Sequence, residues 1–82
     1  MEQIIYCPTK EDSIKAQEKF FKEGIYWIGG DKKINKRIWD IYEEKTCISC
    51  NGKFLTYADI DYYKENYPNI QITQAKEFLK EK

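Results

Sequence analysis

Along residues 45–57, two runs rich in apolar and β-prone residues lie on either side of the pair Asn51-Gly52. This pair tolerates the two positive φ angles of a type I′ turn, so the pattern predicts a β-hairpin with a two-residue loop. Such a loop sets the register of the strands and places Cys50 opposite Lys53. The predicted core face carries Ile48, Cys50, Leu55 and Tyr57, and the other face carries Cys47, Ser49, Phe54 and Thr56.

Further short apolar runs predict strands over residues 3–7, 25–28 and 69–72. Between them, apolar residues recur at the helical period behind residues that commonly cap helices. The first of these segments has an expected apolar stripe of Ile14, Gln17, Phe20 and Phe21, and Gly24 suits the left-handed position after its last turn. The predicted helices cover about residues 9–23, 59–66 and 73–80, with Thr9, Asp59 and Thr73 as their N-caps.

Residues 31–44 are compatible with two structures. Ile34, Ile38 and Ile41 follow a helical period, whereas Trp39 and Ile41 would share one face of a strand. With this segment left open, the order of elements predicts an α+β fold. The 82 residues form a single small domain, with a mixed or antiparallel sheet, the 45–57 hairpin at its centre and the helices mainly on one face.

The formal net charge of the chain is zero, so no overall field attracts it to nucleic acid or to an anionic membrane. No apolar run approaches the roughly 18 residues of a membrane span. The first residues contain neither a basic segment nor the hydrophobic segment of a secretion signal. We therefore expect a cytoplasmic protein.

The chain contains three Cys and no His. Cys47 and Cys50 form a CxxC motif, but strand alternation points their sulfurs to opposite faces, and Cys7 adds at most a third thiolate. Free thiols are therefore expected, with no metal and no cofactor. The absence of His also removes the commonest general base, and neither Asp59 with Asp61 nor Glu43 with Glu44 has a spacing suited to acid–base work. We expect no enzymatic activity.

One segment combines residues that favour ligand or partner binding. Gly29-Gly30 gives access to backbone N–H groups, the following cations can neutralise an anionic group, and indole rings can stack on a base. The spacing matches neither a P-loop nor a dinucleotide motif, so a solvated basic loop between two core tryptophans is the competing interpretation. In the 59–66 helix, Tyr63 and Tyr67 should face the core. The candidate binding residues are Trp27, Gly29, Gly30, Lys32, Lys33, Lys36, Arg37, Trp39, Tyr42 and Tyr62.

The pattern as a whole resembles small uncharacterised proteins of phages and prophages of Gram-positive bacteria. The resemblance covers most of the chain and carries over no catalytic residue. The features that carry it are Pro8-Thr9 after the first strand, Gln17, Phe20 or Phe21, Gly24, Trp27, Gly29, Thr46-Cys47-Ile48, Leu55-Thr56-Tyr57, Tyr62-Tyr63 and the closing residues 72–79.

This resemblance implies an accessory protein that acts by binding, similar to anti-CRISPR proteins or to sponges for signalling nucleotides. The expected function is antagonism of a host defence system through stoichiometric binding to a host defence protein. The first alternative is a sponge that sequesters a nucleotide signal through residues 29–37, with a pre-formed pocket that homo-oligomer formation would help to build. The second alternative is a nucleic-acid-binding accessory protein, which the zero net charge disfavours.

Overall fold

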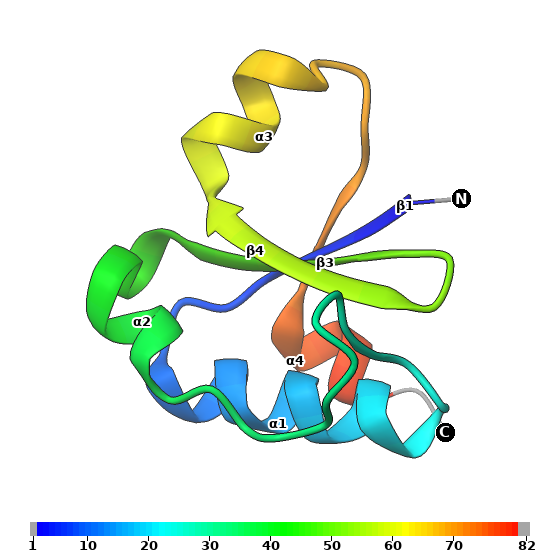
Figure 1. Cartoon of the computed structure of the whole chain (residues 1–82). Coiled ribbons are helices and arrows are strands. Elements are labelled where there is room, and N and C mark those ends of the chain that lie inside the picture. Colours follow the sequence, from blue (N-terminus) through cyan, green and yellow to red (C-terminus); the bar gives the residue numbers. More distant parts are fainter. Residues whose placement is uncertain (1, 81–82) are drawn as a thin grey trace.

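Five strands in the order β2-β4-β3-β1-β5 form one mixed sheet in the computed structural model, which describes residues 2–80 (Figure 1). β3 pairs antiparallel with β1 and β4, whereas β5 and β2 are parallel to their neighbours β1 and β4. The predicted α+β fold with a mixed sheet is confirmed. The elements are β1 (Glu2–Tyr6), α1 (Lys10–Lys22), β2 (Tyr26–Trp27), α2 (Arg37–Tyr42), the 3₁₀ helix η1 (Glu43–Lys45), β3 (Thr46–Asn51), β4 (Phe54–Asp59), α3 (Ile60–Asn66), β5 (Ile72–Gln74) and α4 (Ala75–Lys80).

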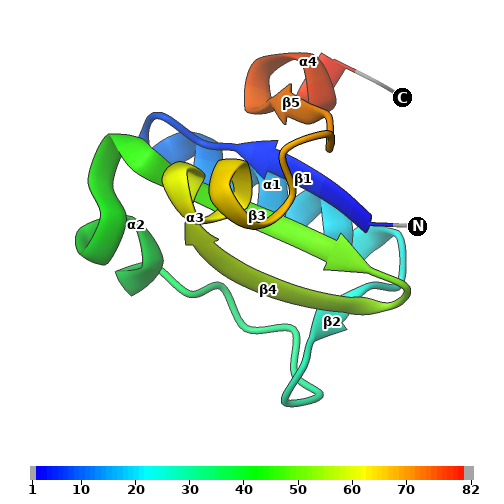
Figure 2. The same cartoon turned by 90° about the horizontal axis from the view of Figure 1, so that it is seen from above.

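The helices lie mainly on one face of the sheet, as predicted. Figures 1 and 2 show α1, α2 and α4 on one side of the strands and α3 on the other. The main core cluster lies on the α1 side, where Ile48 and Leu55 from the hairpin pack with Phe20 from α1 and Phe78 from α4. A smaller cluster lies on the α3 side and contains the buried residues Ile4, Cys47 and Tyr63.

Both ends of α1 have the predicted local structure. The Thr9 hydroxyl accepts a hydrogen bond from the Asp12 N–H at 3.1 Å, and Gly24 takes a φ of 84°. The residues that α1 buries fully are Ser13, Ala16, Gln17 and Phe20. Of the predicted apolar stripe, Phe21 also packs against the main core cluster, whereas Ile14 does not belong to it. Both are only half-buried. The small side chains of Ser13 and Ala16 occupy the centre of the buried face and turn the stripe away from Ile14.

The register of the hairpin differs from the prediction. Asn51 stays in the strand opposite Phe54, so the two-residue loop is Gly52-Lys53 and Cys50 lies opposite Leu55. Gly52 has a φ of 68°, and a glycine with positive φ at the first loop position is typical of a type II′ turn. The new pairing moves each partner by two residues, so both predicted faces keep their members.

The C-terminal boundaries also differ from the prediction. Asp59 caps α3 by accepting a hydrogen bond from the Tyr62 N–H at 2.7 Å, as predicted. The last strand spans Ile72–Gln74 rather than 69–72, because it pairs with Ile4–Tyr6 of β1. Thr73 therefore lies in the strand and caps no helix. Tyr67 is 40% exposed, not core-facing, because it follows the last turn of α3 in a non-helical conformation.

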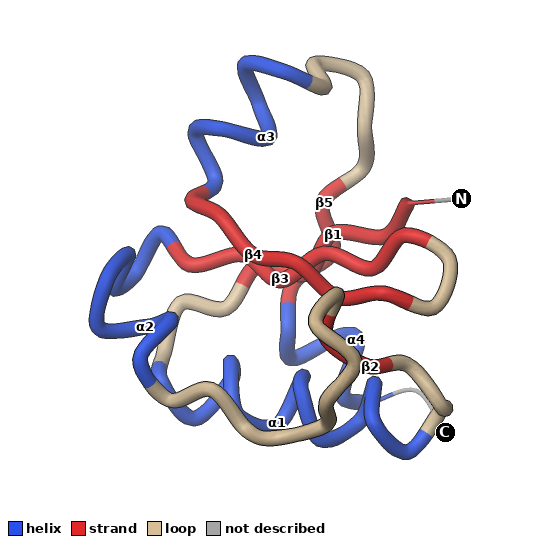
Figure 3. The backbone as a smooth tube through the Cα atoms, viewed as in Figure 1, coloured by secondary structure: helices blue, strands red, loops and turns tan. Residues whose placement is uncertain are grey.

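The undecided segment 31–44 consists of a loop, α2 and the start of η1. Figure 3 shows the loop leaving β2 and passing across α1 before α2 begins. In α2, Ile38 is fully buried while Ile41 is 60% exposed, so neither proposed period describes the whole segment. The second strand is shorter than the predicted 25–28, because the chain reverses direction after Trp27: the N–H of Gly30 donates to the carbonyl of Trp27 at 2.7 Å.

Candidate binding surface

Trp27 fixes the shape of the loop that follows β2. Its indole is buried, and its Nε1–H donates to the carbonyl of Lys33 at 2.9 Å. Its main-chain N–H donates to the carbonyl of Asp31, also at 2.9 Å. Gly30 takes a φ of 93° within this turn, a conformation that favours glycine. Trp27 therefore holds the loop of residues 28–36, here called the basic loop, in place against the sheet.

Gln17 holds the other end of the same loop. This fully buried side chain exchanges two hydrogen bonds with the main chain of Asn35: its Nε2 donates to the carbonyl at 3.0 Å, and its Oε1 accepts from the N–H at 2.7 Å. The apolar stripe predicted from the sequence included Gln17, but this role was not predicted. A glutamine at a core position of a helix is the signal that could have indicated it, because buried amides require hydrogen-bond partners.

A first depression, here called the basic depression, opens between this loop and β4 with a volume of about 560 Å³. No ion pair among residues 2–80 includes Lys33, Lys36 or Arg37, so three unpaired cations border this depression beside the single carboxylate of Asp31. Such a site favours an anionic group. Its lining residues are Trp27, Asp31, Lys33, Ile34, Asn35, Lys36, Arg37 and Tyr57.

A second depression of about 440 Å³, here called the tyrosine depression, lies on the α3 side of β4. Three of its tyrosines belong to α3 or follow it, and the Tyr62 ring lies 5.2 Å from the Tyr63 ring between centroids. Beneath it, the Ser49 hydroxyl is within hydrogen-bond distance of Thr56 Oγ1 at 2.7 Å and of Tyr63 Oη at 2.8 Å. The lining residues are Tyr42, Thr56, Tyr57, Ala58, Tyr62, Tyr63 and Tyr67.

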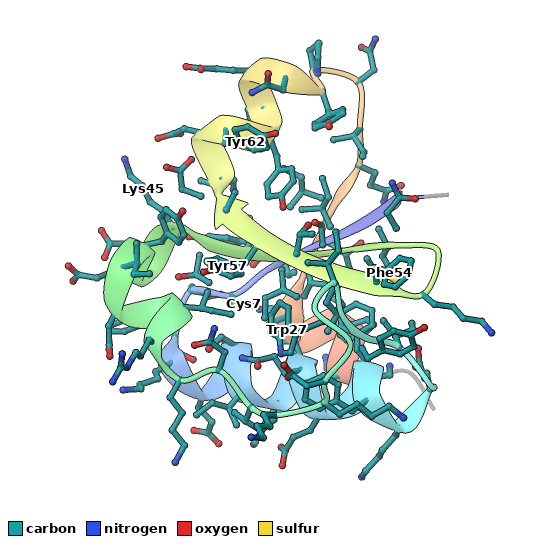
Figure 4. All side chains as sticks on the ribbon, in the orientation of Figure 1. Cys7, Trp27, Lys45, Phe54, Tyr57 and Tyr62 are labelled. Carbon is teal, nitrogen blue, oxygen red and sulfur yellow. The ribbon has the colours of Figure 1, made fainter. Side chains whose placement is uncertain are left out.

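Tyr57 lines both depressions and joins them into one surface. Its ring makes edge contacts with Trp27 at 5.9 Å and with Tyr42 at 6.1 Å between centroids. In Figure 4, Tyr57 and Trp27 lie on the α1 side of the β4 ribbon, whereas Tyr62 projects from α3 on the other side. Tyr57 is 37% exposed and was not among the predicted site residues. It lies on the predicted core face, but β2 ends before reaching it.

The structure brings some of the predicted site residues together and separates others. Trp27, Lys33, Lys36 and Arg37 line the basic depression. Tyr42 and Tyr62 line the tyrosine depression. The remaining four candidates, Gly29, Gly30, Lys32 and Trp39, line neither of them.

Trp39 lies apart from the surface that the depressions form. It is half-buried on α2, and its indole Nε1 is buried without a hydrogen-bond partner among residues 2–80. Of the two tryptophans in the sequence, Trp27 therefore supports the candidate surface, and Trp39 does not line it.

The three cysteines are free and buried, and those of the CxxC motif lie on opposite faces as expected. Burial raises the pKa of Cys7 far above its ordinary range and that of Cys47 to about 12, so both are neutral thiols at physiological pH. Within residues 2–80, no three Cys, Asp or Glu side chains are grouped so that they could hold a metal ion.

Two of the carboxylates considered for acid–base work, Asp59 and Asp61, have structural contacts. Asp59 caps α3. Asp61 forms an exposed ion pair with Lys45 at 3.1 Å, which connects α3 to η1, and this contact raises the pKa of Lys45. An exposed pair of this kind contributes little stability.

Comparisons with known protein families, curated protein sequences and solved structures gave no match to this chain. Over residues 2–80, no helix is long and apolar enough to cross a membrane.

Proposed function

We propose that this chain is a non-enzymatic accessory protein that binds a protein partner stoichiometrically and thereby antagonises a host defence system. The observation that carries the proposal is the position of Tyr57, which joins two depressions into one surface of aromatic rings and unpaired cations. Tyrosine, tryptophan and arginine are the residues most enriched among those that dominate binding energy at protein interfaces.

The shape of the surface favours a protein partner over a small ligand. Both depressions are open to solvent, and enclosed ligand pockets usually cover most of a small molecule's surface. Large side chains at their margins are exposed, with Tyr62 at 46% and Tyr67 at 40%. Exposed aromatic rings next to charged side chains are typical of the composition of protein interfaces.

In the direct test, the tagged chain is used to capture the partner from a lysate of a Gram-positive host. The stoichiometry of the purified complex is then measured by light scattering. Tyr57→Ala should weaken the complex by roughly 2 kcal/mol or more, because it removes the ring shared by both depressions. Phe54→Ala is the matched control, since Phe54 is an exposed aromatic residue of the same strand that lines neither depression. Equal affinity of the two variants would contradict the proposed surface.

The biological part of the proposal follows from the resemblance to phage accessory proteins and needs its own test. Expression of the chain in a host that carries a defence system should restore phage plating, whereas expression of the Tyr57→Ala variant should not. If the wild-type chain restores plating in no host whose defence system contains the captured partner, antagonism of host defence is wrong.

A nucleotide ligand is the second candidate, and one observation favours it. Trp27 and Tyr57 lie beside three unpaired cations in the basic depression, whose volume of about 560 Å³ is within the range of small-molecule sites. Thermal unfolding with mono-, di- and cyclic nucleotides tests this candidate. A site saturated at a thousandfold excess over Kd should add roughly 4 kcal/mol to the free energy of unfolding. An unchanged Tm with every nucleotide would exclude tight binding at this site.

A further inference from the structure

The strand β4 has an edge that is only partly covered. Its neighbour β2 pairs with Phe54 and Leu55 and then ends, so Thr56–Asp59 have β3 on one side and no strand of residues 2–80 on the other. Figure 2 shows β2 beside only one end of β4. We call Thr56–Asp59 the free edge of β4. Such an edge is a template for pairing with another chain.

The main chain of Tyr57 points its hydrogen-bonding groups out of the sheet at this edge. The Leu55 carbonyl accepts a hydrogen bond from the Ile28 N–H at 3.3 Å, so the main chain of Leu55 is directed away from β3. Tyr57 follows two residues later, and alternate residues of a strand direct these groups to the same side. Within residues 2–80, neither the N–H nor the carbonyl of Tyr57 makes a hydrogen bond on the side of β4 away from β3.

The two depressions meet at this same edge: Tyr57 lines both, and the tyrosine depression continues to Tyr62 and Tyr63 of α3. Side chains of a strand added beside β4 would alternate between the α1 face, with the basic depression, and the α3 face, toward which the tyrosine depression continues. The cations of Lys33, Lys36 and Arg37 have no partner among the described residues. They therefore complement an acidic side chain on the first face.

We infer that the partner contributes an extended segment that adds as a strand to the free edge of β4, with an acidic side chain facing the basic depression and its neighbours facing the tyrosine depression. This inference rests on the proposed function and specifies its partner chemistry. Main-chain hydrogen bonds would supply the pairing, and the two depressions would select the side chains.

A displayed library of short random peptides, panned against the full immobilised chain, is the first test. Enriched peptides are synthesised and their affinity is measured by fluorescence anisotropy. The expected consensus contains an acidic residue in a sequence free of proline at the pairing positions, with affinity that falls as salt rises. An enriched set without acidic residues, or no enrichment, would overturn the inference.

Two pairs of variants separate charge from main-chain pairing. Arg37→Glu should weaken the best peptide roughly tenfold or more. Lys32→Glu, a cation of the preceding loop that lies outside the depression, should change affinity less than about twofold. Tyr57→Pro should bind about tenfold more weakly than Tyr57→Ala, because only proline removes the N–H. An edge strand tolerates proline where the N–H faces solvent, and circular dichroism checks that the variant folds. Equal affinities within either pair would contradict the inference.

Amide hydrogen exchange of the wild-type chain supplies a test that needs no variant. Saturation with the peptide should slow exchange of the Tyr57 amide roughly tenfold or more, because this N–H gains a partner. The amides of Thr56 and Ala58 face β3 and serve as internal controls with little change. Unchanged exchange at Tyr57 in the saturated complex would overturn strand addition even if the peptide binds.

The outcomes distinguish this inference from the proposed function. A captured protein that depends on the Tyr57 side chain but leaves the Tyr57 amide unprotected would refute strand addition and retain the proposed function. If a peptide protects this amide but no stoichiometric protein complex forms in the host, the proposed function would be refuted and strand addition retained. Sedimentation of the chain alone tests a second copy as the occupant: a dimer that Tyr57→Pro abolishes would overturn the inference.

Discussion

The two faces of the sheet differ in how completely they are covered. On the α1 side, three helices close over a buried cluster that includes Phe20, Ile48 and Leu55. On the α3 side, one short helix buries Tyr63 against Ile4 and Cys47, and hydroxyl groups occupy part of the buried space. The first face therefore carries most of the apolar burial that stabilises the fold.

This difference assigns separate roles to the two sides. The covered face fixes the positions of β4 and of the loop before α2, whereas the α3 side leaves the rings of Tyr62 and Tyr67 exposed. Because α3 is held by few buried contacts, it should open locally at a lower free-energy cost than the helices of the other face. Binding is thus expected at the edge of β4, where β2 ends and the tyrosines of α3 are exposed.

Adjacent residues of β4 give the largest test of this comparison. Leu55 is fully buried on the α1 side, so Leu55→Ala should lower the free energy of unfolding by about 3 kcal/mol through lost burial and a cavity. Phe54 is 44% exposed on the other face, and Phe54→Ala should cost less than about 1 kcal/mol. Urea denaturation measures both. Similar losses would refute the assignment of stability to the α1 side.

The connection between the covered face and the binding surface depends on Gln17. Gln17→Ala should lower the free energy of unfolding by about 2 kcal/mol, because it removes both hydrogen bonds that hold the main chain of Asn35. It should also increase amide exchange in residues 31–37. Glu18→Ala, an exposed neighbour on α1, is the control with little effect on either quantity. Unchanged exchange in the loop would show that Gln17 does not position it.

Local rules predicted the elements whose signals lie within a few residues. The capping of α1 by Thr9 and of α3 by Asp59, the positive φ of Gly24 and the two faces of the hairpin all follow from short-range chemistry. The loop register was missed because Asn51-Gly52 and Gly52-Lys53 both satisfy a two-residue turn. Pairing of Asn51 with Phe54 selects the second.

The binding surface could be predicted only in part, because it forms between segments distant in sequence. The cations of residues 33–37 were recognisable as a basic group, but their placement depends on Gln17 in α1 and on Trp27. Tyr57 was assigned to the core because periodicity identifies its face and not how far β2 extends along β4. Strand length at an edge is a tertiary property that no local pattern contains.

Two buried thiols, Cys7 and Cys47, lie in different core clusters, so the pH dependence of unfolding allows the two faces to be compared. Burial raises the pKa of Cys7 in the α1-side cluster, and raises that of Cys47 in the other cluster from 9.0 to about 12. The unfolded chain ionises these thiols at lower pH than the folded chain does. The stability they contribute is therefore complete below about pH 9 and falls as the pH rises toward 12, by at most about 1.4 kcal/mol per pH unit for each thiol.

Alkaline denaturation of the wild type and of Cys47→Ala and Cys7→Ala measures this slope. Each variant should lose part of the pH dependence. Thiol labelling at pH 8 should be faster at Cys47 than at Cys7, because opening of α3 alone exposes the first. Equal labelling rates, both limited by global unfolding, would show that α3 does not open separately.

The smallest expected effect concerns the hydroxyl groups beneath α3. Tyr63→Phe keeps the buried ring and removes the Oη that lies 2.8 Å from Ser49 Oγ, while Ser49 retains Thr56 as a partner at 2.7 Å. Because Ser49 keeps this second partner, the loss in the free energy of unfolding should be only about 1 kcal/mol or less. Exchange of the α3 amides should nevertheless increase, since this contact joins the helix to β3. Tyr62→Phe is the control, as its ring is 46% exposed. A global loss as large as that of Leu55→Ala would mean that the α3 side is as essential to the fold as the covered face.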